Sequence, residues 1–110
     1  MKNEELVRYY INILSTRQFD KETLDSKWNS LRKMGRDLKV SFLHAKPEDI
    51  RNLIISKKES REWTTKSTIR EYIYRLNNFY RFLIAEQLLE AVDNPMPKIK
   101  NLIIDKKYPR

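Results

Sequence analysis

Apolar side chains recur along most of this chain at intervals of about 3.6 residues, the period of an amphipathic α-helix. The longest such run follows Trp63, and at about 100° per residue its apolar side chains fall within one broad arc. This arc comprises Ile69, Tyr72, Ile73, Leu76, Phe79, Tyr80 and Leu83. The pattern predicts one long helix that buries this arc and is capped at its start by Thr64 or Thr65.

Three shorter segments upstream have the same period, at residues 3–16, from residues 20–23 to about residue 38, and from Pro47 onward. Asn3, Asp20 and Thr23 are candidate N-caps, and Pro47 suits the first turn of a helix. The expected inward side chains are Leu6, Tyr10, Ile13, Leu14, Leu24, Trp28, Leu31, Leu38, Ile50, Leu53 and Ile54. We therefore predict an all-α fold, a single bundle of roughly four to five helices.

The connecting segments are predicted from their polar and helix-breaking residues. We expect a charged loop at residues 57–62, a short helical turn at residues 88–92, and a break at residues 94–97 before an extended basic tail. Gly35 falls on the buried face of the second helix, where a glycine costs about 1 kcal/mol relative to alanine. Its expected use is the close approach of a neighbouring helix.

The composition agrees with this fold and excludes several kinds of site. The 110 residues include one Gly, four Pro and no Cys, which argues against a turn-rich β fold and excludes disulfides and thiolate metal sites. The Asp and Glu residues are scattered, so neither a metal site nor a paired-carboxylate hydrolase is indicated. No apolar run approaches the ~18 residues of a membrane span, and the polar start is no signal peptide. We expect a cytoplasmic protein without metal or cofactor.

The net charge of +8 is concentrated in two segments. Residues 57–81 contain seven basic and three acidic residues, and residues 95–110 contain five basic and one acidic, so each segment carries +4. A basic excess confined in this way is typical of a nucleic-acid footprint. The alternative is a solvated surface helix followed by a basic tail.

Along one edge of the apolar arc lie Lys66, Arg70, Tyr74, Asn77 and Arg81, which we call the basic stripe. Ser67 falls just beyond it, and neither Glu71 nor Glu86 falls among its members. Arg and Asn can pair with guanine and adenine edges, and a helix start with hydroxyls offers an anion site, although plain N-capping explains the hydroxyls equally. The predicted DNA contacts are Thr65, Lys66, Ser67, Arg70, Tyr74, Asn77 and Arg81, with Lys57 and Lys58 before the helix and Lys98 and Lys100 after it.

Most of the aromatic residues are predicted to be core rather than base-stacking platforms. Tyr72 and Tyr80 belong to the apolar arc of the long helix, and Trp28 belongs to that of the second helix. Trp63 precedes the threonine cap and is expected to be a hydrophobic staple or a core plug. Tyr74 is the exception, because its place in the stripe allows contact with a phosphate or a sugar.

A family resemblance is carried by the long helix and the residues around it. They are Thr68, Ile69, Leu76, Phe79, Tyr80, Phe82, Leu83, Ala85, Glu86, Leu88, Leu89, Asn94 and Pro95, with Thr23, Leu24, Trp28, Leu31, Leu38 and residues 46–50 upstream. In this order and spacing, residues 20–110 resemble the N-terminal core-binding, or SAM-like, domain of the tyrosine recombinases and phage integrases. Two positions depart from the family pattern. Gln87 replaces a glycine that would take a left-handed C-cap, so the cap is expected to be strained or the helix to end differently, and Lys46 replaces a capping Thr or Ser.

The resemblance implies a domain at residues 1–94 that grips double-stranded DNA at a recombination core site, followed at residues 95–110 by a basic linker towards a catalytic domain of the same protein. Higher-order assembly is then expected only on DNA. The family cuts DNA with a tyrosine supported by two arginines, a lysine and a His-x-x-Arg motif, and this chain lacks that set. His44 is followed by Ala45, Lys46 and Pro47, and Tyr108 has no such partners, so we expect a DNA-binding protein that is not itself an enzyme. Two alternatives stay open: a helical interaction module for an acidic protein partner, and a stand-alone recombination regulator.

Overall fold

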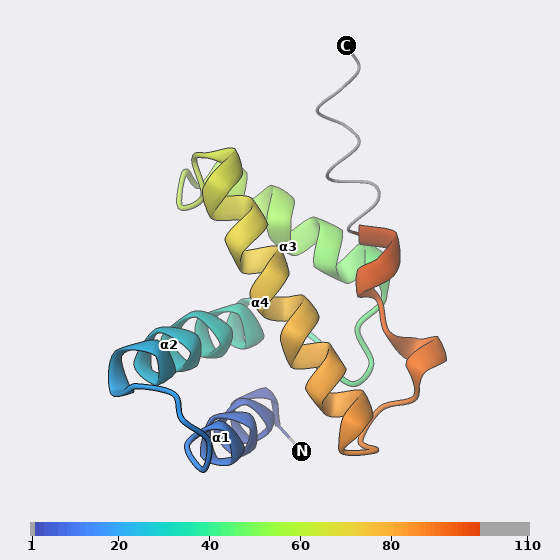
Figure 1. The fold of residues 1–110 in the computed structure, drawn as a ribbon. Coiled ribbons are helices and arrows are strands. Elements are labelled where there is room, and N and C mark those ends of the chain that lie inside the picture. The colour runs from blue at the N-terminus through green and yellow to red at the C-terminus, as the bar shows by residue number, and fades with distance from the viewer. Residues whose placement is uncertain (1, 100–110) are drawn as a thin grey trace. The chain divides into compact units, whose positions relative to one another are not determined.

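Every regular element that the structure describes is helical. The structure is a computed structural model that describes residues 2–99. Its elements are α1 (Asn3–Leu14), α2 (Lys21–Asp37), α3 (Pro47–Glu59), α4 (Lys66–Ala85) and the 3-10 turn η1 (Ala91–Asp93), which are coloured from blue to red in Figure 1. The predicted all-α class is confirmed. None of the helices within residues 2–99 is long and apolar enough to cross a membrane.

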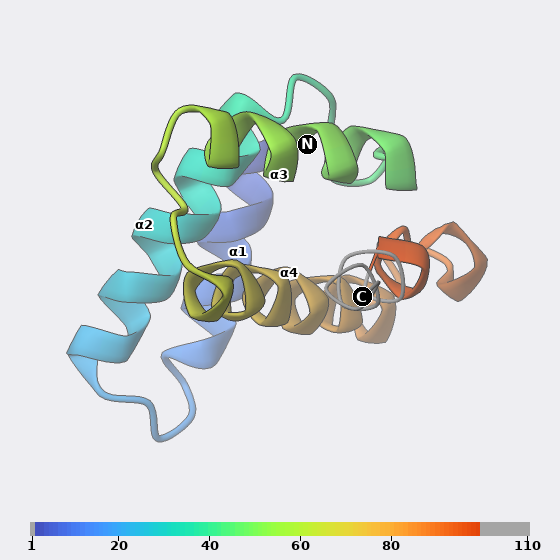
Figure 2. The same cartoon turned by 90° about the horizontal axis from the view of Figure 1, so that it is seen from above.

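The chain divides into two compact units, residues 1–42 and residues 43–110, which are described separately. In the first unit α1 and α2 pack side by side as a helical hairpin, as both Figure 1 and Figure 2 show. Its buried apolar side chains are Leu6, Val7, Tyr10, Leu14, Leu31, Met34, Leu38 and Phe42. Leu24, Trp28 and Ile13, which were also expected inside, are only half-buried. The expectation of one domain over residues 1–94 stays a prediction.

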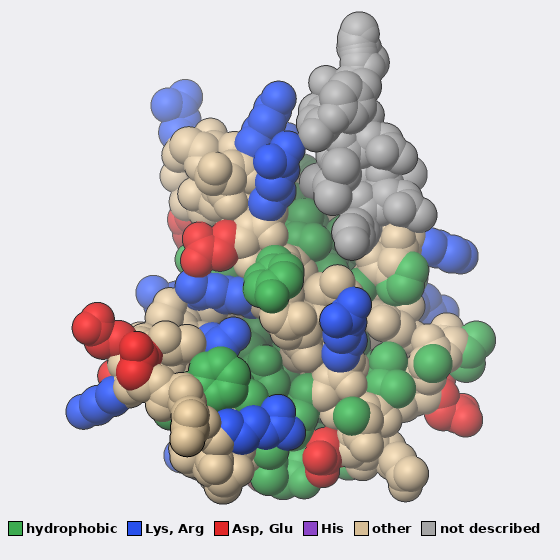
Figure 3. Space-filling model, in the orientation of Figure 1, with side chains coloured by type: hydrophobic (Ala, Val, Ile, Leu, Met, Phe, Trp, Pro, Cys, Tyr) green, Lys and Arg blue, Asp and Glu red, His purple; other side chains and the backbone are tan. Residues whose placement is uncertain are grey.

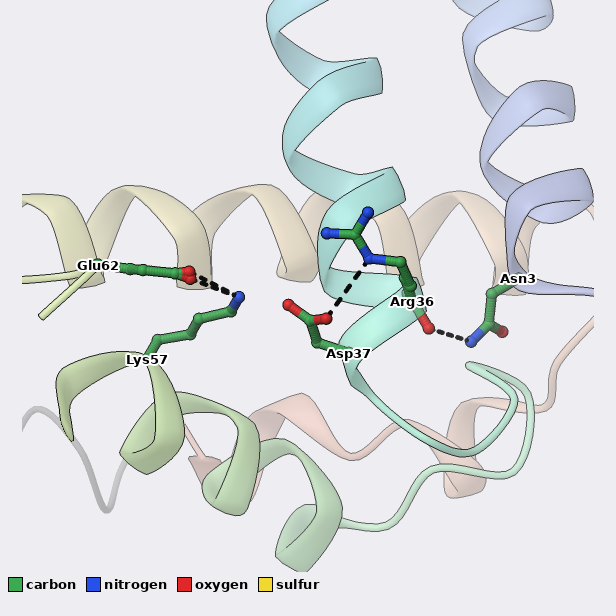
Figure 4. A network of polar contacts seen from close by, with 6 residues as sticks. Asn3, Arg36, Asp37, Lys57 and Glu62 are labelled. Carbon is green, nitrogen blue, oxygen red and sulfur yellow. Dashed lines mark hydrogen bonds and ion pairs between the residues drawn. The ribbon is translucent and has the colours of Figure 1, made fainter. Parts of the chain in front are cut away.

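Asn3 joins the start of α1 to the end of α2. Its predicted role as the N-cap is wrong, because Lys2 is the N-cap and Asn3 is the first helical residue. The Asn3 side-chain nitrogen donates to the carbonyls of Gly35 and Val40, both at 2.9 Å, and its side-chain oxygen accepts the Phe42 N–H at 2.7 Å. Figure 4 shows Asn3 beside this end of α2. One amide therefore satisfies three backbone groups around the C-terminus of α2.

Gly35 lies where these segments meet. A Cβ built on Gly35 would lie 2.9 Å from Cε2 of Phe42 and 3.0 Å from Cβ of Asn3. Both distances are shorter than a carbon–carbon van der Waals contact. The predicted close approach at Gly35 is confirmed, and the neighbours are the first turn of α1 and the Phe42 ring.

In the second unit, α3 and α4 bury the faces that the sequence predicted, apart from two positions. Ile50, Leu53 and Ile54 of α3 are buried. The buried residues of α4 are Ile73, Leu76, Phe79, Tyr80, Phe82 and Leu83, so Phe82 joins the arc while Ile69 and Tyr72 are half-buried. Ala45, Trp63, Leu89, Met96 and Ile99 are also buried in this unit. Residues 96–99 are helical, where a break and extended chain were predicted, and the turn predicted at residues 88–92 is η1, at Ala91–Asp93.

Helix α4 ends in a left-handed residue despite having no glycine there. Gln87 has φ 61°, its N–H donates to the Ile84 carbonyl at 3.0 Å, and the Leu88 N–H donates to the Leu83 carbonyl at 2.9 Å. These two bonds form a Schellman motif, which usually has glycine at the left-handed position. Of the two outcomes expected for Gln87, the strained cap is the one observed.

The start of α3 has a lysine at the N-cap position in place of a capping Thr or Ser. The Lys46 side chain makes no capping hydrogen bond, but the Lys46 backbone N–H donates to the Asp49 carboxylate at 2.9 Å. Pro47 occupies the first turn, as predicted. Asp49 therefore supplies one of the hydrogen bonds of a capping box without a Ser or Thr at the cap.

Candidate nucleic-acid interface

The start of α4 differs electrostatically from the starts of the other described α-helices. Thr65 is its N-cap, and the Thr65 hydroxyl oxygen accepts the Thr68 N–H at 3.1 Å, which confirms one of the two predicted threonine caps. The first turns of α1, α2 and α3 each contain Asp or Glu, whereas the first turn of α4 contains none and begins with Lys66 and Ser67. The first turn of α4 thus supplies no carboxylate to the positive end of the helix dipole.

The basic stripe lies on the exposed side of α4. Lys66, Arg70 and Arg81 are exposed, Asn77 is half-buried, and the Tyr74 side chain is 64% exposed. Within residues 2–99 none of the three cations forms an ion pair with a carboxylate. Figure 3 shows Lys and Arg side chains along α4. The stripe therefore presents unneutralised positive charge together with one large aromatic ring.

The single carboxylate of α4, Glu71, is paired with an arginine that lies away from the stripe. Arg75 donates to Glu71 at 2.7 Å between Nη2 and Oε2, and the Arg75 guanidinium lies 5.6 Å from the centroid of the Tyr72 ring. At about 100° per residue, Arg75 is nearly opposite the stripe. The negative charge of Glu71 is therefore compensated away from the stripe.

Trp63 anchors the segment that leads into α4. Its side chain is only 5% exposed, and its ring stacks on the Tyr72 ring with centroids 4.4 Å apart and planes inclined by 9°. A hydrophobic staple would place the apolar residue directly before the N-cap, whereas Trp63 lies one residue earlier. Trp63 is thus the core plug, the second of the two roles predicted for it.

The cations that flank α4 differ in their surroundings. The loop predicted at residues 57–62 is wrong in its first half, because α3 continues through Glu59. Lys57 has a side chain that is 12% exposed and bonds to the Glu62 carboxylate at 3.0 Å (Figure 4). Lys58 and Lys98 are exposed, and Lys100 lies outside the described residues. For all four lysines, nucleic-acid contact stays a prediction.

Arg61 explains how Glu62 reaches Lys57. It takes φ 66°, its N–H donates to the Lys58 carbonyl at 3.1 Å, and the Glu62 N–H donates to the Lys57 carbonyl at 3.0 Å. This second Schellman motif turns the chain back over the last turn of α3. The ion pair between Lys57 and Glu62 is a consequence of that reversal.

The other chemically notable residues offer no reactive arrangement in the described part of the chain. His44 is exposed in the turn before α3, as expected, and Tyr108 is outside the described residues. Burial raises the pKa of the Tyr80 phenol above its ordinary value, and the Asp49 carboxylate adds to the shift, so this phenol stays neutral. Residues 2–99 contain no group of three His, Asp or Glu side chains that could hold a metal ion.

A groove of about 570 Å³ lies between residues 43–47 and residues 88–98. Its charged lining includes Lys46 and Lys98 as well as Glu90 and Asp93. Positive and negative groups are mixed in this groove, so it shows no preference for an anionic ligand.

Three arginine contacts were not predicted from the sequence. Arg8 and Arg32 place their guanidinium groups 5.2 Å and 5.8 Å from the Trp28 ring centroid, and Arg75 lies over Tyr72. Trp28 and Arg32 are four residues apart on one helix, and Tyr72 and Arg75 are three apart on another, so the spacing could have indicated both of these contacts. The contact of Arg8 with Trp28 depends on how α1 packs against α2.

Comparisons of this chain with protein-family models, with curated proteins and with solved structures give no match. The resemblance to the tyrosine recombinases stays a prediction that rests on the sequence motifs.

Proposed function

We propose that this chain binds double-stranded DNA through the basic stripe of α4, as the core-binding domain of a tyrosine recombinase or integrase, and does not itself cut DNA. The observation that supports the proposal is the charge arrangement of α4. Its exposed side carries three cations that form no ion pair within residues 2–99, its first turn contains no acidic residue, and its one carboxylate is paired with Arg75.

The chemistry of the stripe suits a duplex. Lys66 and the exposed N-terminal turn suit phosphate oxygens, which attract cations and free backbone N–H groups. Arg70, Asn77 and Arg81 lie along one line of the same helix, and an α-helix fits the major groove, where Arg and Asn pair with guanine and adenine. Tyr74 adds a hydroxyl and an apolar ring for the sugar-phosphate backbone.

In this proposal the chain binds the DNA, and a catalytic domain of the same protein cleaves it. The protein is then cytoplasmic and DNA-associated, and it assembles into larger complexes only on DNA. An acidic protein partner is the competing occupant of the stripe, because carboxylates satisfy the same cations. The two differ in whether duplex DNA alone suffices for binding.

The test is a salt titration of binding to a fluorescent duplex. We expect a non-specific dissociation constant of roughly 10⁻⁴ to 10⁻⁶ M at physiological salt, with log K falling linearly against log salt as counterions are released. A flat dependence on salt would exclude phosphate binding whatever the affinity. Binding that requires an acidic protein and ignores DNA would favour the interaction module instead.

A further inference from the structure

Glu71 is the only acidic residue of α4, and it lies at the border of the basic stripe. On a helix surface, residues three and four apart are neighbours, so Glu71 has Tyr74 on one side and Ser67 on the other. A carboxylate that turned towards these two residues would place negative charge beside the phosphates that the stripe is proposed to bind. The orientation of Glu71 therefore sets the electrostatic potential of this face.

Arg75 holds that orientation. Its guanidinium donates to Glu71 at 2.7 Å, and the Arg75 side chain is only 18% exposed, whereas the Glu71 side chain is 59% exposed. The guanidinium also lies over the Tyr72 ring, which stacks on the ring of Trp63. Because this aromatic stack holds Arg75 in place, the guanidinium keeps the Glu71 carboxylate turned away from the stripe.

We propose that Arg75 is a positioning residue for the basic stripe, which keeps the negative charge of Glu71 away from a bound polyanion without touching that polyanion itself. The inference rests on the proposed function for its biological meaning. Its electrostatic content concerns the free protein and can be measured without DNA.

The first measurement reads the surface potential of the free protein by NMR. Soluble nitroxides of opposite charge enhance the relaxation of nearby amide protons according to the local potential, and the amides of Ser67, Arg70 and Tyr74 report on the stripe. In Arg75→Gln the ratio of anionic to cationic enhancement should fall by about twofold to fivefold, the size expected for one unit charge at a few ångströms in screened water. In the double variant Glu71→Gln/Arg75→Gln the ratio should return to the wild-type value.

The second measurement is a double-mutant cycle on duplex affinity with the same variants. Arg75→Gln should weaken binding by about threefold to tenfold when Glu71 is present and by less than about twofold when residue 71 is glutamine. Glu71→Gln alone should change affinity by less than about twofold, because Arg75 already compensates the carboxylate and the glutamine oxygen can accept the same hydrogen bond. Arg75→Lys should stay close to wild type, since the ammonium keeps a cation beside Glu71.

The chain provides a matched control on α1. Arg8 pairs with Glu4 at the same four-residue spacing, at 3.0 Å, and its guanidinium lies over the Trp28 ring. Arg8→Gln removes the same charge as Arg75→Gln, so it measures the effect of net charge alone. The Glu4–Arg8 cycle should show no coupling in duplex affinity.

Four results would overturn the inference. They are an unchanged potential at the stripe in Arg75→Gln, an equal loss of affinity in both backgrounds at residue 71, a loss in Arg75→Lys as large as in Arg75→Gln, and a large gain from Glu71→Gln in the presence of Arg75. The result for Glu71→Gln can be measured even if Arg75→Gln fails to fold. If the potential responds as expected and the wild-type chain does not bind DNA, the positioning role stands and the proposed function fails.

Discussion

Asn3 donates a hydrogen bond of 2.9 Å to the carbonyl of Gly35, which lies 32 residues further along the chain. The same amide bonds to Val40 and Phe42, so it ties the first turn of α1 to the last turn of α2 and the residues that follow. Helix C-termini leave carbonyl groups without intrahelical partners, and here a side chain of another helix supplies the donor. The arrangement also explains the glycine, since a Cβ at Gly35 would press against Asn3 and Phe42.

We therefore expect Asn3→Ala to lower the free energy of unfolding by about 2 to 3 kcal/mol, because it removes three hydrogen bonds and leaves part-buried backbone groups unsatisfied. Urea denaturation followed by circular dichroism measures the change. Asn12→Ala, at an exposed position of the same helix, is the control and should cost less than about 0.5 kcal/mol. Equal effects of the two substitutions would show that the Asn3 contacts do not stabilise the hairpin.

A second prediction concerns the left-handed cap of α4. Gln87→Gly should stabilise the protein by about 0.5 to 1 kcal/mol, because the strain of a non-glycine residue at φ 61° exceeds the extra entropy that glycine gains in the unfolded chain. Ala85→Gly, two residues earlier and still helical, should instead destabilise by about 0.5 to 1 kcal/mol. Thermal unfolding of both variants gives opposite signs if the cap is strained, and the same sign if it is not.

A third prediction separates the two sides of α4. Arg70→Ala and Arg81→Ala should each weaken duplex binding about fivefold and reduce the salt slope by about 1, while stability changes by less than about 0.5 kcal/mol. Arg17→Ala removes an exposed cation outside the stripe and should leave the slope nearly unchanged. Leu76→Ala should cost about 2 to 5 kcal/mol of stability, because Leu76 is fully buried. If the arginine variants unfold and Leu76→Ala leaves stability unchanged, the buried and exposed faces of α4 are assigned the wrong way round.

The N-cap of α2 predicts a dependence of stability on pH. The Asp20 side chain accepts hydrogen bonds from Thr23, which lowers the pKa of Asp20 below 3.8 in the folded state. A depressed folded pKa stabilises the protein above the unfolded pKa, and this stabilisation is lost as the pH falls through the folded pKa. The stability advantage of wild type over Asp20→Ala should thus be complete at neutral pH and shrink below pH 3.8. Asp20→Asn, which caps without titrating, should keep its advantage over Asp20→Ala at low pH, and a parallel decline in both would contradict the prediction.

The last prediction concerns DNA cleavage. The chain should form no covalent 3′-phosphotyrosine link with a nicked suicide substrate, even at concentrations that saturate the DNA, because the sequence has no His-x-x-Arg motif to support a tyrosine nucleophile. Denaturing electrophoresis of labelled DNA detects such a link as a slow-migrating band. A band that disappears in Tyr108→Phe would identify Tyr108 as a nucleophile.

The sequence by itself determined the features that depend on neighbouring residues. The helical period located the buried faces around Ile50 and Leu76, and Pro47 located the start of α3. The caps at Asp20 and Thr65 were also predictable, since in each a side chain accepts an N–H three residues ahead. The same period predicted the exposed side of α4, and so it placed the residues of the basic stripe together on one face.

Only the tertiary structure decided which groups meet across larger distances in the chain. Asn3 resembles an ordinary N-cap in sequence, and its bonding to Gly35 depends on the packing of α1 against α2. Trp63 and Tyr72 are nine residues apart on two different segments, and their stacking depends on how the residues before α4 fold against that helix. The pairing of Lys57 with Glu62 depends on the left-handed turn at Arg61 that reverses the chain. A left-handed arginine has no sequence signature, because its strain is offset by contacts that form only when the surrounding residues pack.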